Sequence, residues 1–192
     1  MHNFNKSNGL TLLYSIQMAV LNIPDQNVQI TDFQEIKAFL SERGILLEKW
    51  EASVPFASDA DQETILQAYA HVLYPYMEKN GYKTADVINI NANTPNYEAI
   101  RNKFLSEHRH TEDEVRFFVE GQGYFWFNLE GSPVFNVLCQ AGDLISVPAN
   151  TKHWFDAGKE NPHVKAIRIF SDTSGWVPHY TESGIDAKYN PA

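Results

Sequence analysis

Two stretches of this sequence decide its fold: residues 108–121, HRHTEDEVRFFVEG, and residues 142–153, GDLISVPANTKH. The first follows the pattern His-x-His-x3-Glu-x6-Gly, and the second follows Gly-x5-Pro-x4-His. Turn-forming Gly, Pro, Asn and Asp residues separate short apolar runs around them. Short strands spaced this closely are typical of a β-sandwich or small barrel. The predicted strands are 84–91, 114–120, 123–129, 133–139, 143–147, 152–156 and 163–170.

Four potential metal ligands lie in these two stretches. Side chains two apart on a strand share a face, so His108 and His110 can point at one ion. A turn can bring Glu114 to the same place, and His153 comes from the second stretch. Three imidazoles and one carboxylate suit a divalent ion such as Fe(II), Ni(II), Mn(II), Co(II) or Zn(II). A single His-x-His is also common on surface strands, so the metal interpretation depends on the whole pattern.

The residues around the ligands have predicted orientations of their own. If Glu114 points into a barrel, alternation along the strand turns Arg116 inward as well. A buried arginine needs a partner, which is either an anionic substrate or a nearby carboxylate. Glu112 and Asp113 are expected to be solvent-exposed turn residues. The same alternation points Phe118 inward and turns the residues between outward, namely Val115, Phe117 and Val119.

The first part of the chain is predicted to contain helices. Thr31 and Gln34 fit a capping box, and apolar residues at helical spacing follow until Gly44. Further on we expect a short strand at 45–50, a helix at 61–79 that Gly81 ends, and a short helix at 97–105. These elements predict one domain over 1–192, with an N-terminal extension (1–82), a barrel (83–170) and a C-terminal tail (171–192).

Composition narrows the functional classes. The chain has 192 residues and a formal net charge of −9, which argues against nucleic acid or an anionic membrane as a main partner. Cys139 is the single cysteine, so an internal disulfide is excluded, and we expect this thiol to be buried. The apolar run at 10–21 is too short to span a bilayer and reads as a strand. We expect a cytoplasmic monomer.

The two motifs resemble those of the cupin superfamily, whose fold is a double-stranded jelly-roll β-barrel that holds a metal ion. The flanking sequence is similar to the acireductone dioxygenase family in particular. That resemblance covers roughly residues 30–182, and the stretches that carry it are 50–52, 104–121, 142–156, 166–170 and 175–178.

The resemblance implies that His108, His110, Glu114 and His153 hold one Fe(II) or Ni(II) ion per chain. It implies an enzyme of methionine salvage that oxidises the acireductone 1,2-dihydroxy-5-(methylthio)pent-1-en-3-one with O2. The Fe(II) form would yield 4-methylthio-2-oxobutanoate and formate, and the Ni(II) form 3-methylthiopropanoate, formate and carbon monoxide. It assigns Arg116 to the substrate as the catalytic residue; other predicted substrate-binding residues are Phe104, Phe155, Trp176 and Arg168.

Two alternatives stay open at this point. One is another cupin metalloenzyme, a different dioxygenase or an isomerase, which substrate profiling would separate. The other is a non-enzymatic cupin that binds a metal or a small ligand. Bound zinc with no O2 consumption would favour the second alternative.

Overall fold

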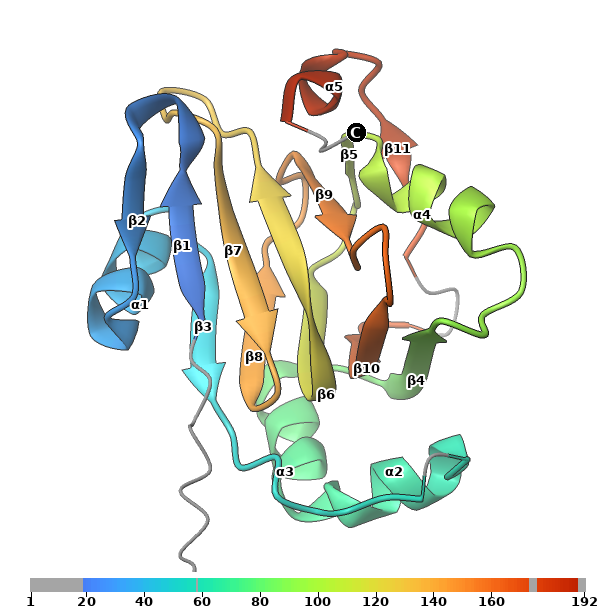
Figure 1. Cartoon of the computed structure of the whole chain (residues 1–192). Helices are drawn as coiled ribbons and strands as arrows, with labels where there is room; N and C mark the ends of the chain where they lie inside the picture. Colours follow the sequence, from blue (N-terminus) through green and yellow to red (C-terminus); the bar gives the residue numbers. More distant parts are fainter. Residues whose placement is uncertain (1–18, 58, 173–175, 190–192) are drawn as a thin grey trace, which may run out of the picture.

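The computed structural model describes residues 19–57, 59–172 and 176–189, and in this part the chain is mainly antiparallel β structure flanked by helices (Figure 1). The strands are β1 (Val20–Ile23), β2 (Val28–Ile30), β3 (Leu46–Lys49), β4 (Thr84–Asn91), β5 (His108–Arg109), β6 (Glu114–Phe127), β7 (Phe135–Gln140), β8 (Asp143–Val147), β9 (His153–Asp156), β10 (His163–Phe170) and β11 (His179–Tyr180). The helices are η1 (Pro24–Gln26), α1 (Phe33–Ser41), α2 (Gln62–Ala68), α3 (Ala70–Asn80), α4 (Tyr97–Leu105) and α5 (Ile185–Tyr189).

The strands pair in two groups that share β6. One group has the order β2-β1-β7-β6-β9-β5-β11, and the other has the order β3-β8-β6-β10-β4. The first half of β6 lies between β8 and β10, and its second half lies between β7 and β9. The two groups enclose an apolar interior, so the predicted mainly-β jelly-roll barrel with added N-terminal helices is confirmed.

The predicted break between two strands at 120–123 is wrong, because β6 runs through it as one strand of 14 residues. Gly121 has φ +71°, and the register with β10 shifts between Lys165 and Ala166. A Cβ built on Gly121 would lie 1.8 Å from the carbonyl oxygen of His163, so only glycine fits there. Such a bulge redirects a strand without ending it, and β6 can pass from one group of strands to the other.

Alternation along β6 sorts its side chains as predicted. Phe118 and Phe125 lie in the interior cluster with Phe155 and the buried Cys139. Val115 and Phe117 face the other way and pack against the helices. Burial of these apolar side chains on both faces contributes stability at about 25 cal/mol per Å2 of area removed from water.

Helices α2 and α3 cover the outer face of β6, β8 and β10 through buried Ile65, Tyr69 and Leu73. The single helix predicted at 61–79 is interrupted at Tyr69, whose backbone (φ −101°, ψ 7°) leaves the helical region between α2 and α3. The capping box predicted at Thr31 is also wrong. The N-cap of α1 is Asp32, whose carboxylate accepts the backbone N–H groups of Gln34 and Glu35.

The last described residues return to the strand that begins the first motif. β11 pairs with β5, so Tyr180 lies opposite His108. Among the residues described, no helix has the length and apolar character that crossing a membrane requires. Most of the strand predicted at 10–21 lies outside the described residues, and β1 begins at Val20.

Candidate metal centre

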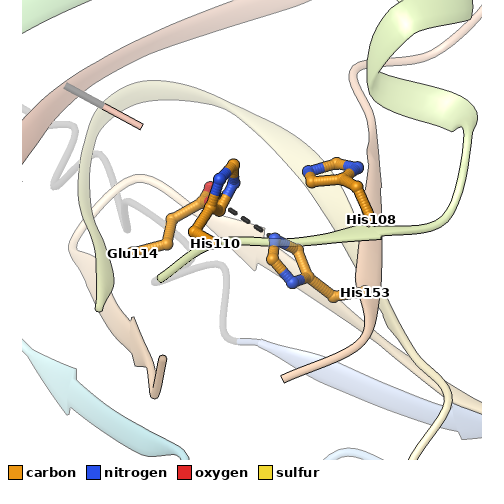
Figure 2. Close-up of side chains that lie close together, drawn as sticks. All are labelled: His108, His110, Glu114 and His153. Atoms are coloured by element: carbon orange, nitrogen blue, oxygen red, sulfur yellow. Dashed lines mark hydrogen bonds and ion pairs between the residues drawn. The ribbon is translucent and has the colours of Figure 1, made fainter. Parts of the chain in front are cut away.

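Three strands bring the predicted metal ligands together. His108 and His110 lie on and just after β5, His153 begins β9 directly opposite His108, and Glu114 begins β6. One ligand atom from each side chain lies within 4.8 Å of the others. Figure 2 shows the four side chains pointing toward one another. All four are buried, so the arrangement is held inside the barrel.

Backbone carbonyls orient the three imidazoles. Nδ1 of His108 donates to the Ser106 oxygen at 2.7 Å, and Nδ1 of His153 donates to the Thr151 oxygen at 2.8 Å. His110 donates in the same way to the Val177 oxygen at 3.0 Å. A carbonyl can only accept, so each Nδ1 carries a proton, and each ring in its neutral form presents a bare Nε2 to the centre.

A divalent cation fits this donor set. Nε2 of His110 and Nε2 of His153 lie 3.0 and 3.1 Å from the same Oε2 of Glu114. Two bare nitrogens and a carboxylate oxygen repel one another at such distances unless a proton or a cation lies between them. Imidazole nitrogen and carboxylate oxygen are ligands for Fe, Ni, Mn, Co and Zn ions. One such ion at the centre would accept the lone pairs of all these atoms together.

The surroundings of His108 and Glu114 shift their pKa values so that both side chains are deprotonated at neutral pH and can bind a cation. Burial lowers the pKa of His108 to about 4, and nearby His153 adds to the effect, so its Nε2 is free at neutral pH. Burial opposes ionisation of Glu114, but Arg116 and the two neighbouring imidazoles hold its pKa well below the usual value. Burial also acts to lower the pKa of His110, yet its contact with Glu114 raises it above the usual value.

Arg116 is the unusual group beside the ligands. It is 3% exposed, and its Nη2 lies 2.8 Å from Oε1 of Glu114. Its Nε and Nη1 are buried and have no hydrogen-bond partner among the described residues. The guanidinium carbon lies 4.4 Å from the ring centre of Phe155 and 5.5 Å from that of Trp176. Unpaired buried donors are costly, and an anionic ligand would satisfy them.

The other predicted substrate-binding residues differ in their surroundings. Phe155 is fully buried and packs edge to face with half-buried Phe104, their ring centres 6.4 Å apart. The ring of Trp176 lies 6.0 Å from that of His110. Arg168 instead makes a two-pronged ion pair with Asp86, at 2.7 and 2.5 Å. The structure therefore places Phe155 and Trp176 beside Arg116, with Phe104 behind Phe155. The guanidinium carbon of Arg168 also lies 5.6 Å from the Trp176 ring, but its fork is paired with Asp86.

The expectation that Glu112 and Asp113 are exposed turn residues is wrong. Both are partly buried. Asp113 accepts hydrogen bonds from Ala149, Tyr82 and Trp176, which come from three distant parts of the chain. The carbonyls that orient the imidazoles were also missed, since main-chain groups leave no residue-type signal in a sequence. An acidic residue next to a ligand is the one sequence feature that could have indicated Asp113.

Comparison with known proteins gives one consistent result. Residues 22–178 match the sequence profile described as "ARD/ARD' family". A relative from Picosynechococcus sp., named acireductone dioxygenase, is 58% identical over 172 residues, covering 90% of this chain and 97% of its own length. One of the same name from Pseudomonas aeruginosa is 44% identical, covering 88% and 92%.

A solved structure, described as acireductone dioxygenase from Bacillus anthracis with a cadmium ion in its active centre, is also similar to this chain. It superimposes with a TM-score of 0.79 at 38% identity, covering 85% of this chain and 99% of that one.

Proposed function

Because this chain belongs to the ARD/ARD' family and is a dioxygenase of that family, we propose that it oxidises the acireductone 1,2-dihydroxy-5-(methylthio)pent-1-en-3-one with O2 in methionine salvage. The observation that carries the proposal is the buried group of His108, His110, Glu114 and His153 beside Arg116, whose Nε and Nη1 have no partner among residues 19–57, 59–172 and 176–189. These four residues would hold one Fe(II) or Ni(II) ion. A cytoplasmic, monomeric protein is proposed on the sequence alone.

The bound ion would supply a template and Lewis acid for the paired oxygens of the substrate anion. The chain supplies the rest of the site. Nε and Nη1 of Arg116 donate to a substrate oxygen, which orients the anion and satisfies both buried nitrogens. Phe155 and Phe104 form an apolar wall for the methylthio tail and exclude water from the reacting atoms. Glu114 stays ionised, because Arg116 and the imidazoles favour its charged form.

No side chain is needed as a general base if the substrate binds already ionised. We propose that the Fe(II) form yields 4-methylthio-2-oxobutanoate and formate, and the Ni(II) form 3-methylthiopropanoate, formate and carbon monoxide. In both cases the products together contain every atom of the substrate and of O2.

O2 uptake with acireductone tests the proposal. The protein is stripped of metal and reloaded anaerobically with Fe(II) in one sample and Ni(II) in another. We expect uptake from both, with carbon monoxide released from the nickel sample only. A His108→Ala variant, treated in the same way, should lose metal and uptake together. Bound metal with no O2 uptake by the unsubstituted protein would exclude the proposed activity.

A further inference from the structure

Asp113 joins three segments of the chain, two of which contact the metal ligands. Its Oδ1 accepts the backbone N–H of Ala149 at 2.9 Å, and its Oδ2 accepts the Tyr82 hydroxyl at 3.2 Å. Its own backbone oxygen accepts the indole N–H of Trp176 at 3.0 Å. The next residue in the chain is Glu114. Three acceptor atoms of one residue therefore bind three segments beside a candidate ligand.

The contact with Ala149 holds the loop that leads to His153. The next residue, Asn150, has φ +64° and donates its N–H to the His110 oxygen at 2.7 Å. Thr151 follows, and its carbonyl accepts Nδ1 of His153. If Ala149 moved, the two residues that contact His110 and His153 would move with it. The Asp113 carboxylate is the side chain that fixes the start of this loop.

The contact with Trp176 holds the C-terminal segment beside the site. The next residue, Val177, supplies the carbonyl that accepts Nδ1 of His110. The Trp176 ring also lies 5.5 Å from the guanidinium carbon of Arg116. Because the backbone oxygen of Asp113 makes this bond, it would survive replacement of the Asp113 side chain. The main chain of Asp113 thus acts on His110 through Trp176 and Val177, whereas its side chain acts on His110 and His153 through the Ala149 loop, and a substitution removes only the second effect.

We propose that Asp113 is a positioning residue of the metal centre, whose carboxylate sets the placement of His153 and His110 through the Ala149 loop and so strengthens metal binding. The proposal rests on the proposed metal centre and is independent of the substrate. Hydrogen-bond partners of metal ligands typically change metal affinity by roughly 10- to 100-fold when they are removed. The Asp113 carboxylate acts on His110 and His153 through the Ala149 loop and contacts neither directly, so we expect a loss toward the lower end of that range when it is removed.

Metal affinity of the full chain, measured with Ni(II) or Co(II) alone against a competing chelator, tests the proposal without substrate. Asp113→Ala removes both side-chain contacts and should weaken binding toward the lower end of the range of roughly 10- to 100-fold. Asp113→Asn keeps an acceptor for Ala149 and a donor for the Tyr82 oxygen, so it should restore nearly the full affinity. The Co(II) absorption spectrum should change in the alanine variant and stay unchanged in the asparagine variant.

Two control variants separate positioning from general stability. Tyr82→Phe removes one contact of Asp113 and leaves the Ala149 contact, so it should bind metal nearly as well as the unsubstituted protein. Asp32→Ala removes a carboxylate that also accepts backbone N–H groups, but at the start of α1, which packs on β3 and β1. It should lower the unfolding temperature and leave the metal affinity unchanged.

Asp113→Glu covers the case in which the alanine variant does not fold. It keeps the charge but displaces the acceptor by one methylene, so it should bind metal more weakly than Asp113→Asn. Unchanged metal affinity in Asp113→Ala would overturn the proposal, and so would equal weakening by Asp113→Asn and Asp113→Ala. If the alanine variant does not fold, unchanged metal affinity in Asp113→Glu would overturn it. An unsubstituted protein that binds no metal would reject the metal centre itself. Metal binding without O2 uptake would reject only the proposed function.

Discussion

Replacing Arg116 with Met should remove activity while leaving metal in place. Met keeps most of the volume among Phe155, Phe125 and Trp176, so the rings need little rearrangement. What disappears is the guanidinium, with its contact to Glu114 and the two nitrogens that have no partner in the described part of the chain. In the loaded enzyme the bound cation still balances the charge of Glu114. The expected loss is therefore one of substrate binding and orientation.

The size of the loss follows from the donors. A hydrogen bond to a charged group contributes about 1.5–3 kcal/mol, and Nε and Nη1 of Arg116 can each make one to the substrate. Their joint loss amounts to about 3–6 kcal/mol. At about 1.4 kcal/mol per tenfold change, kcat/KM should fall by about 10^2- to 10^4-fold. In metal-free protein, loss of the Arg116 contact leaves Glu114 with His110 and His153 as its charge partners, so stability should also fall.

The assay is O2 uptake against acireductone concentration, with the metal content of each sample measured. The matched control is Arg168→Met, in which the lost donors were already bonded to Asp86. That variant should lose less than about tenfold, as expected for a partly exposed pair. Full metal occupancy with kcat/KM unchanged in Arg116→Met would show that Arg116 does not bind the substrate. An equal loss in both variants would show that unpaired donors do not mark the substrate site.

Three further perturbations test other parts of the site. Burial holds the pKa of His108 at about 4, below its usual 6.5, so between these pH values the unfolded chain binds more protons than the folded one. The unfolding free energy of the metal-free protein, measured by denaturant titration, should therefore fall as the pH drops from about 6.5 to about 4, and this fall should be smaller in His108→Asn. A Cβ on Gly123 would lie 2.3 Å from Cζ of Phe155, so Gly123→Ala should cost about 1–3 kcal/mol and raise KM for acireductone, as calorimetry and uptake assays would report. Chelating the metal should lower the unfolding temperature, because an ion at 100 times its Kd stabilises the fold by about 2.7 kcal/mol; no change in a thermal melt would mean that the four ligands bind no ion.

Features that depend on near neighbours in the chain were predictable from the sequence. The shared direction of His108 and His110, and that of Glu114 and Arg116, follow from the two-residue period of a strand. The helix at Tyr97–Leu105 and the helix end at Gly81 follow from apolar periodicity and from a backbone that only glycine adopts easily. These features depend on local sequence, so they can be predicted without knowledge of the rest of the fold.

Features that depend on partners far apart in the chain needed the tertiary structure. His153 lies opposite His108 because β9 and β5 pair in one register, and that register results from contacts across the whole barrel. Asp86, rather than a substrate, takes the Arg168 fork because β4 pairs with β10. Asp113 looked like a solvated turn residue, yet it binds Ala149, whose chain position is 36 residues away. Residue types and their local spacing limit which side chains can bind a metal, whereas long-range strand pairing selects which of them meet and what holds them there.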